Sequence, residues 1–453
     1  MSRMPVIMIF DIGKTNKKLM LFNQHYKIVH EETVHFEETT DEDGFHCEDL
    51  LLLGDWVLKC YHKWIESTEF QIKAINISAY GASFALIDEN DKPIFPLYNY
   101  LKPYPASLQL IFYEKYGGAV PFSLTTASPV LGSLNSGLQL FRLKVERNEL
   151  FQKVKFALHL PQYLSFLITN RPFADITSIG CHTGLWNFQK NQYHQWVFSE
   201  QIAEKLPPIQ STEKVFNVVQ NDMVCGIGLH DSSAALIPYL KNIKEPFLLI
   251  STGTWCVSLN PFNQNALSEE ELSKDCLFYI SYDGKPIKAS RLFAGHYHEV
   301  QSKRLSDFFK VHYDDCKQVK FNIELIKGIS NADDNNQADF NPHKFDFSEI
   351  DLNRFTCFEE AYHHLMMNIV DLQFMSTNLV LKNTPVTEIY IDGGFSNNEV
   401  FLQLIAIRFS KYKVFAATVA QASALGAAIA IHDSWNTIPI STDIIKFRQI
   451  NNS

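Results

Sequence analysis

The stretch VIMIFDIGKTNKKLMLF, residues 6–22, decides the fold. Its apolar, β-branched opening predicts a buried strand, and residues 18–22 predict a return strand. The Gly-Lys-Thr between them is also how a P-loop ends. A P-loop needs a glycine at the position of Met8, inside the apolar run, and a helix after Thr15. We therefore reject a P-loop and predict a β-hairpin with a polar turn.

Asp11 stands at the end of the predicted first strand. A carboxylate there is costly to bury unless a cation or hydrogen-bond donors accompany it. The turn that follows is rich in N–H and hydroxyl groups, which can face an anion. Both features would be explained if Asp11 bound Mg²⁺ and the turn bound phosphoryl oxygens. An ordinary Asx-type hairpin turn explains them equally well at this stage.

The same order of elements occurs twice along the chain. After the hairpin come a third strand within 26–36, an amphipathic helix around 53–64 and a strand at 72–78. A second strand-turn-strand follows at 247–259, around the turn STGTW (251–255), and leads to a long helix and a buried strand at 358–379 and 386–394. This repetition predicts a duplicated, two-lobed α/β protein. Residues 263–351 interrupt the second copy, and their polar stretch 331–337 predicts a surface loop.

Two further stretches combine glycines with polar residues at a predicted helix start. GGFSNN (393–398) lets the backbone approach a ligand, with Ser396 or Asn397 as the expected N-cap of the next helix. An adenosine phosphate over that helix start and a plain connection are both open. In GIGLHDSSAALIPYL (226–240), Asp231 is either a helix N-cap or a general base for a hydroxyl that attacks phosphorus.

Composition limits the classes of function. The chain has 453 residues, 46% hydrophobic, 13% aromatic and 20% charged, which fits two globular domains. Its formal net charge of −10 argues against nucleic-acid binding. No apolar run approaches ~18 residues, so we expect no membrane span. The 8 cysteines form no CxxC pair and the N-terminus resembles a strand, not a signal peptide, so we expect reduced thiols and a cytoplasmic location.

His296 and His298 are weaker candidates for a site. On a strand they would point to one face and could bind a metal, but no Cys or carboxylate partner has ligand spacing. We do not expect a metal centre there.

Taken in order, these motifs resemble the FGGY family of carbohydrate kinases, in the actin-like (sugar kinase/Hsp70) ATPase superfamily, almost end to end. DIGKTNKKLMLF is similar to the first phosphate motif, STGTW to the second and IDGGFSNN to the adenosine motif. HDSSAA resembles the motif with the catalytic aspartate, and ASALGAAIAI (422–431) the closing helix near the nucleotide. His230-Asp231 and STGTW lean towards the rhamnulokinase branch.

The resemblance implies two actin-like (ribonuclease H-like) domains, 1–240 and 241–453, each a mixed five-stranded sheet flanked by helices, with a cleft between them. It implies Asp231 as catalytic base and Asp11 as the Mg²⁺ residue. The expected ATP-binding residues are Gly13, Thr15, Asn16, Lys18, Thr252, Gly253, Thr254, Gly393, Gly394 and Asn397. The expected sugar-binding residues are Gly81, Ser83, Asn99, Tyr100, Lys102, His230 and Asp231.

The chain departs from the family pattern in two places. Lys14 stands where the family usually has Thr or Ser, so it either adds a cation to the phosphate site or points to solvent. In PLYNYLKPYP (96–105), Tyr100 and Lys102 replace the usual Asp and Arg that bind sugar hydroxyls. The second departure puts the identity of the sugar in doubt, but not the phosphoryl transfer.

The expected function is therefore ATP- and Mg²⁺-dependent phosphorylation of a ketose such as L-rhamnulose or a related 6-deoxy-ketohexose. Fuculose, xylulose and ribulose stay open as substrates, and so does a non-catalytic sugar- or nucleotide-sensing role. The resemblance also gives a homodimer as the expected assembly.

Overall fold

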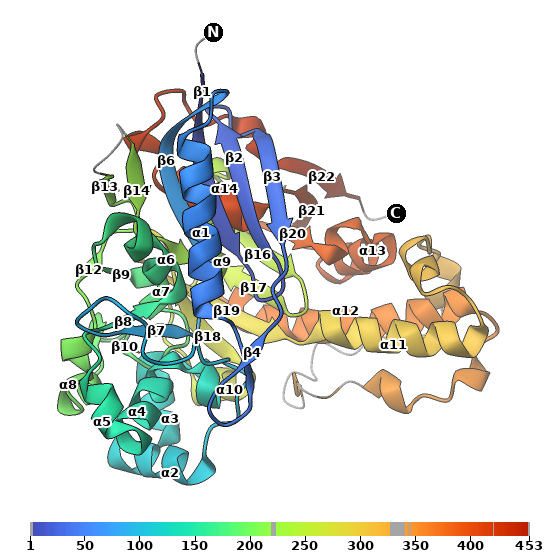
Figure 1. Ribbon diagram of the computed structural model, residues 1–453. Coiled ribbons are helices and arrows are strands. Elements are labelled where there is room, and N and C mark those ends of the chain that lie inside the picture. The colour runs from blue at the N-terminus through green and yellow to red at the C-terminus, as the bar shows by residue number, and fades with distance from the viewer. Residues whose placement is uncertain are drawn as a thin grey trace. The chain divides into compact units, whose positions relative to one another are not determined.

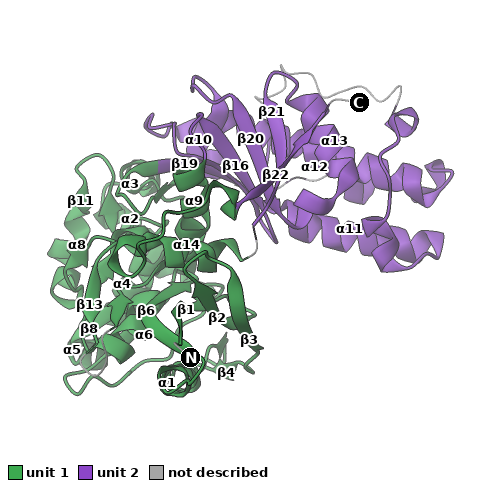
Figure 2. Cartoon of the chain, turned by 90° about the horizontal axis from the view of Figure 1, so that it is seen from above, with its two compact units in different colours: residues 1–242, 278–286, 420–444 green, residues 243–277, 287–419, 445–453 purple. Residues whose placement is uncertain are grey.

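The computed structural model describes residues 3–218, 223–326, 340–342, 344, 346–419 and 421–451. The chain forms two compact units, coloured separately in Figure 2. Unit 1 comprises Met1–Asn242, Phe278–Pro286 and Ala420–Ile444, and unit 2 the remaining segments. Two late segments thus group with the N-terminal unit, and the boundary expected at residues 240/241 stays a prediction. The loop expected at 331–337 lies outside the described residues.

Unit 1 is built on a seven-stranded sheet whose order is β13-β14-β6-β1-β2-β3, with β15 also paired to β6. The strands β1, β2 and β3 are antiparallel, whereas β6 runs parallel to β1 and to β14. The predicted opening hairpin is confirmed as β1 and β2. The strands are β1 (Met4–Ile12), β2 (Lys17–Asn23), β3 (Ile28–Val34), β6 (Phe70–Ala79), β13 (Val215–Asn217), β14 (Val224–Gly226) and β15 (Leu229–His230).

Helices cover both faces of this sheet, which explains why β1 is apolar on both sides. Met8 and Phe10 share a core with residues of α1 (Leu50–Ile65) and α6 (Leu160–Thr169), and α1 lies in front of the strands in Figure 1. The other face carries α9 (Asp231–Asn242) and α14 (Ala422–Ala430), which pack on each other and on β6. Asn76 of β6 donates a hydrogen bond of 2.8 Å to the carbonyl oxygen of Ala427.

A second core of unit 1 is aromatic and gathers around Phe112 and Trp196, whose ring centroids are 5.1 Å apart. Ile280 of the segment Phe278–Pro286 belongs to this core, which explains why the segment groups with unit 1. The elements of this region are β7 (Phe84–Ile87), α2 (Ala106–Lys115), α3 (Ala119–Thr126), α4 (Ser136–Glu146), α5 (Asn148–Gln152), β8 (Phe156–His159), α7 (Ile176–Ile179) and α8 (Gln195–Ser199).

The second sheet also has seven strands, in the order β18-β19-β17-β16-β20-β21-β22. Among the described residues three helices of ten or more residues accompany it, and α12 packs on β17, α11 and α13. The strands are β16 (Phe247–Thr252), β17 (Cys256–Asn260), β18 (Cys276–Ile280), β19 (Pro286–Leu292), β20 (Glu388–Gly393), β21 (Lys413–Thr418) and β22 (Lys446–Ile450). The helices are α11 (Ala294–Phe309), α12 (Phe358–Leu381) and α13 (Glu399–Arg408).

The predicted duplication is visible in the two sheets. β3-β2-β1-β6-β14 and β19-β17-β16-β20-β21 share one pattern of two antiparallel and then two parallel pairings. The two-domain α/β fold is therefore confirmed. Each sheet has seven strands in place of the five expected, because short or edge strands extend the repeated five-strand core: β13 and β15 in the first sheet, and β18 and β22 in the second.

Within the described part of the chain, we find no helix long and apolar enough to cross a membrane. All eight cysteines are free thiols, and seven of them are buried.

Candidate active site

The first polar turn connects β1 to β2 in unit 1. Asp11 is paired across the hairpin with Lys18, and the turn is closed by the amide of Gly13, which donates to the carbonyl oxygen of Asn16 at 2.9 Å. A Cβ atom on Gly13 would lie 3.2 Å from the same oxygen, so the tightness of this turn favours glycine. The turn is therefore short and well defined, and its polar residues lie at the end of the sheet.

Asp11 is held by the closing helix α14 of the same unit. Ser423 donates a hydrogen bond of 3.1 Å to Asp11 Oδ2. Burial, followed by repulsion from Asp231, raises the pKa of Asp11 to about 6. Lys18 donates to Gln421 Oε1 at 2.9 Å and lies 3.5 Å from Glu31, so its ammonium group is anchored beside the turn.

Lys14 forms an ion pair with Glu38, with Nζ and Oε1 2.5 Å apart. Both side chains are partly exposed. The two alternatives for Lys14 were a cation in the phosphate site or one facing solvent. In the structure the charge of Lys14 is paired with that of Glu38, at the edge of the turn.

The predicted base, Asp231, is the first residue of α9 and follows the buried His230 of β15. The amide of Ser232 donates to Asp231 Oδ1 at 2.6 Å, and its hydroxyl group does so at 3.2 Å. His230 Nε2 lies 3.3 Å from the same oxygen. Burial lowers the pKa of His230, although Asp231 opposes this effect. The imidazole is therefore a neutral neighbour of a carboxylate whose position is fixed by local donors.

Three groups pack closely around His230. Its ring stacks on Tyr279 with centroids 6.0 Å apart, and its Nε2 lies 3.4 Å from Cys181 Sγ. A Cβ atom on Gly81 would come within 2.8 Å of the ring, so a larger residue there would force the ring to move. His230 Nδ1 is buried and makes no hydrogen bond among the described residues. The structure thus brings Gly81 and His230, two of the predicted sugar-binding residues, into direct contact.

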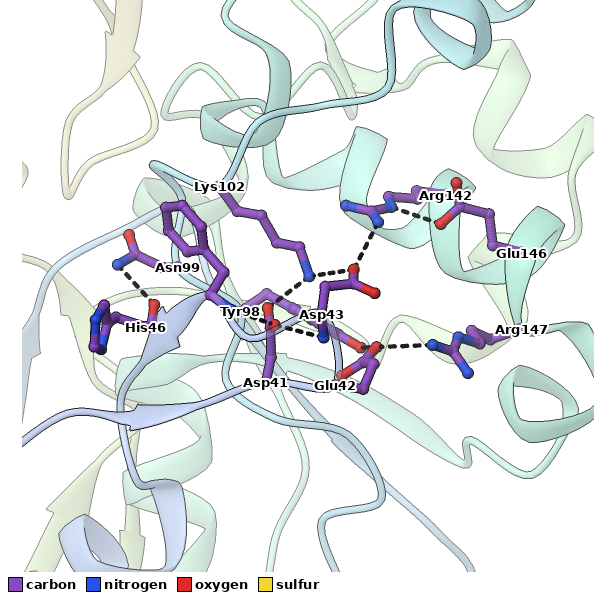
Figure 3. Close-up of polar contacts among 11 residues, drawn as sticks. Asp41, Glu42, Asp43, His46, Tyr98, Asn99, Lys102, Arg142, Glu146 and Arg147 are labelled. Carbon is purple, nitrogen blue, oxygen red and sulfur yellow. Dashed lines mark hydrogen bonds and ion pairs between the residues drawn. The ribbon is translucent and has the colours of Figure 1, made fainter.

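The 98–102 stretch is engaged mainly with a neighbouring acidic loop (Figure 3). Lys102 Nζ lies 2.6 Å from Asp41 and 2.7 Å from Asp43. Asn99 donates to the carbonyl oxygen of His46 at 3.1 Å. These two predicted sugar-binding side chains are therefore committed to protein partners.

Tyr100 has a different environment. Its ring packs edge-on against Tyr80 at 6.1 Å, and burial followed by the charge of Asp231 raises its pKa. Ser83 donates to the carbonyl oxygen of Tyr98 at 2.9 Å and is buried. Of the altered stretch, Tyr100 is the residue that shares the surroundings of the predicted base.

The second polar turn, in unit 2, connects β16 to β17. The hydroxyl group of Thr252 donates to the carbonyl oxygen of Asp392 and accepts a 2.9 Å hydrogen bond from the amide of Phe395. Gly393 has φ +76 and ψ −151, and a Cβ atom on it would lie 1.9 Å from the carbonyl oxygen of Thr252. The STGTW turn and Gly393 of the GGFSNN stretch are therefore packed directly against each other.

A cavity of about 480 Å³ opens beside this turn in unit 2. Its walls include Thr252, Gly253, Gly394 and Asn397, four of the predicted ATP-binding residues. Its volume lies in the range of small-molecule sites.

The sequence did not point to the other wall of this cavity. Tyr362 of α12 lies there, and its hydroxyl group is bonded to His298 Nε2 at 2.9 Å and Asn398 Nδ2 at 2.7 Å. His296 and His298 belong to α11, so the strand face on which a metal pair was considered does not exist. Asn398, not Ser396 or Asn397, caps α13 by accepting from the amide of Phe401 at 2.9 Å. Among the described residues there is no cluster of three or more metal-ligating side chains.

Comparison with known proteins gives matches over both halves of the chain. The model for the N-terminal domain of the FGGY family of carbohydrate kinases matches residues 6–235, and the model for the FGGY C-terminal domain matches residues 244–438. A rhamnulokinase from Halalkalibacterium halodurans is 24% identical over an alignment that covers 93% of this chain and 91% of the relative.

Two solved structures show the same fold. A carbohydrate kinase from Novosphingobium aromaticivorans has a TM-score of 0.79 at 19% identity, covering 99% of this chain and 94% of its own. Plasmodium falciparum glycerol kinase, solved with ADP, has a TM-score of 0.74 at 16% identity, covering 97% and 91%.

Proposed function

The chain belongs to the FGGY family of carbohydrate kinases and is an ATP-dependent sugar phosphotransferase, and from this premise we propose that its acceptor is a ketose, L-rhamnulose or a related 6-deoxy-ketohexose. We propose Asp231 as the general base. The observation that carries this assignment is the fixed carboxylate at the start of α9, with neutral, buried His230 3.3 Å away.

Asp231 has the properties that a base for a sugar hydroxyl needs. Its side chain is 31% exposed, and only Oδ1 is held by Ser232 and His230. Among the described residues Oδ2 makes no hydrogen bond, so this atom is the proposed proton acceptor. Removing the proton as the sugar oxygen approaches phosphorus makes that oxygen a better nucleophile.

The residues of unit 1 fit a divalent cation. Asp11 and Asp231 are two carboxylates close enough for the charge of one to oppose ionisation of the other. Mg²⁺ binds through one or two carboxylates and substrate oxygens, so a larger protein cluster is not required. We propose that Asp11 holds Mg²⁺, which supplies neutralising charge to the phosphates when it is bound. Gly13, Thr15, Asn16 and Lys18 are then the phosphate-facing residues of this unit.

In unit 2, the 480 Å³ cavity fits an adenosine group. We propose that Gly393, Gly394 and Asn397 contact adenosine and that Thr252, Gly253 and Thr254 contact phosphate. The hydroxyl group of Thr252 is already bonded to Asp392 near the C-terminal end of β20 and to Phe395 just after it, so its contribution is to hold the turn, with backbone N–H groups as the donors to phosphate.

The surroundings of Asp231 support a deoxy sugar. Tyr100 replaces the usual acid, and the stacked rings of His230 and Tyr279 add apolar surface. A pocket wall of this kind accommodates a methyl group of the sugar, whereas a more polar wall would bind a hydroxyl group at that position more tightly. Sugar contacts by Gly81, Ser83, Asn99, Tyr100, Lys102 and His230 stay predictions; for Asn99 and Lys102 we propose that they shape the pocket through their protein partners.

A substrate panel tests this proposal. ADP release is measured with L-rhamnulose, L-fuculose, D-xylulose, L-ribulose and glycerol, and the acceptors are ranked by kcat/KM. We expect one of the two 6-deoxy-ketohexoses to rank first. A pentulose or glycerol at the top of the ranking would refute the substrate class. Calorimetric binding of ADP and sugar without any ADP release would instead favour the non-catalytic alternative. The expected homodimer is tested separately, by light scattering during size-exclusion chromatography.

A further inference from the structure

A buried ion pair lies behind the first polar turn. Lys17 Nζ is 2.5 Å from Glu48 Oε1, and the two side chains are only 3% and 4% exposed. Tyr80 donates its hydroxyl hydrogen to Glu48 Oε2 at 2.8 Å. Both carboxylate oxygens are therefore satisfied, and neither charge faces water. We call these three residues the turn anchor.

The turn anchor joins three segments that surround the turn. Lys17 is the first residue of β2 and pairs with Ile12 across the hairpin. Glu48 immediately precedes Asp49, the N-cap of α1. Tyr80 follows β6, and its amide donates to the carbonyl oxygen of Ile12 at 3.0 Å. The turn is thus fixed from its strand, from α1 and from the parallel neighbour strand.

The third contact of Lys17 determines the orientation of one peptide group. Its Nζ donates to the carbonyl oxygen of Lys14 at 3.0 Å. In a trans peptide the C=O and the following N–H point in opposite directions, and no described peptide bond is cis. Because the Lys14 carbonyl is drawn towards the buried ammonium group, the N–H of Thr15 is directed away from it.

A contribution to the stability of the fold does not by itself explain why such a buried ion pair is present. Two charges removed from water pay a large desolvation penalty, and apolar residues of similar size are often at least as stable. The contact of the buried lysine with a backbone carbonyl oxygen of the turn points instead to a role of this pair in the local geometry of the turn. Tyr80 also connects this pair to the predicted sugar-binding residues, since its ring packs on Tyr100 and the next residue is Gly81.

We propose that Lys17, held by Glu48 and Tyr80, is a positioning residue that orients the Lys14–Thr15 peptide so that the Thr15 N–H is presented to the phosphates of ATP. This rests on the proposed role of the turn in phosphate binding. Lys17 does not itself touch substrate. Its effect is transmitted through the backbone, so it changes binding of phosphates and leaves binding of the nucleoside unchanged.

The test compares Lys17→Met, Glu48→Gln and the double variant Lys17→Met/Glu48→Gln with the wild type. Each single change leaves one buried charge unpaired and lowers the melting temperature. The double variant has the same net charge as the wild type and no unpaired charge, so we expect most of the lost melting temperature to return. The Lys14 carbonyl, however, still lacks its donor. ATP affinity in the double variant should therefore remain about tenfold weaker, the effect of one charge-assisted hydrogen bond.

Adenosine binding, measured by the same calorimetry, should match the wild type in the double variant, because adenosine has no phosphate. Lys59→Met is the control, since Lys59 is an exposed lysine of α1 paired with Asp55, and it should bind ATP as the wild type does. Wild-type ATP affinity in the double variant overturns the proposal, and so does an equal loss for adenosine.

These outcomes are separate from a failure of the proposed function. If the wild type phosphorylates none of the sugars but binds ATP, the substrate assignment fails while the comparison of ATP with adenosine still tests the turn anchor. If the wild type is active and the double variant equals it in kcat and in ATP affinity, the turn anchor has no positioning role.

Discussion

The negative charge of Asp231 opposes ionisation of the Asp11 carboxyl group. Burial is the larger cause and repulsion from Asp231 the second, and together they raise the pKa of Asp11 to about 6. In the unfolded chain this group has a pKa of about 3.9. The folded state therefore binds this proton more tightly than the unfolded state.

The first prediction concerns stability and pH. Because the folded pKa is raised, ionised Asp11 destabilises the ligand-free fold above about pH 6, and this penalty disappears as the pH falls through 6 towards 4. Asp11→Asn should therefore be more stable than the wild type at pH 8, by roughly 2–3 kcal/mol. The two proteins should melt together near pH 4. If Asp11→Asn were less stable than the wild type at pH 8, or if the difference in stability did not depend on pH, the raised pKa of Asp11 would be contradicted.

The second prediction concerns the base. Asp231→Asn should lower kcat by roughly 10²–10⁴-fold, the usual contribution of a general base. ATP affinity, measured by calorimetry, should change little. The matched control is Asp433→Asn, which removes a fully exposed carboxylate of the same unit and should leave turnover unchanged. If the purified Asp231→Asn enzyme turned over at the wild-type rate, another group would have to be the base.

The third prediction concerns the contact between Gly81 and His230. In Gly81→Ala the new methyl group would lie 2.8 Å from the imidazole, so the ring must move. We expect kcat/KM for the sugar to fall roughly 10- to 100-fold. A double-mutant cycle isolates the clash: in a His230→Ala background the same change should have almost no further effect. Equal losses in both backgrounds would show that the glycine acts through some other contact.

The fourth prediction compares two adjacent glycines of unit 2. Gly393 has a backbone conformation that other residues rarely adopt, and a Cβ atom there would lie 1.9 Å from the carbonyl oxygen of Thr252. Gly393→Ala should destabilise the protein by at least the backbone strain, on the order of 1–3 kcal/mol, and should abolish adenosine binding. In Gly394→Ala the nearest contact is 3.9 Å, so its melting temperature should stay close to that of the wild type. Similar melting temperatures for both variants would refute the argument.

Local patterns predicted the parts of the fold that local chemistry decides. The apolar run ending at Asp11 is a buried strand, and the STGTW turn lies between two strands, because the hydrophobic period and the turn residues act over a few positions. The motif order was enough to identify the FGGY fold. His296 and His298 would share a strand face only if their segment were a strand, and it is instead part of the helix α11, which packs against α12.

The partners of the functional groups could not be predicted in the same way. Ser423 bonds to Asp11 across 412 positions of sequence, and Lys102 finds Asp41 across 61. Nothing in the local pattern of either residue specifies such a partner, since the contact exists only after the chain has folded. The role of Lys14 depended in the same way on Glu38. The sequence therefore predicts which residue types form the site more reliably than it predicts how each is held.

The fifth prediction follows from Lys102 and Asp41. The Asp41 side chain is fully buried (0% exposed), and Lys102 is its cationic partner at 2.6 Å. Lys102→Met leaves that carboxylate without its counter-charge, which should cost about 3–5 kcal/mol. Lys155→Met is the control, because its acidic partners, Glu89 and Asp91, are exposed and such surface pairs contribute about 0–1 kcal/mol.

The rescue variant Lys102→Met/Asp41→Asn separates two roles of Lys102. If Lys102 acts through the acidic loop, removing both charges should restore most of the stability and also the KM for the sugar. If its ammonium group contacts the sugar directly, as the family pattern predicts, stability should return while the KM stays raised. A single Lys102→Met variant as stable as the control would show that the buried pair does not hold the loop, and the proposed indirect role would then fail.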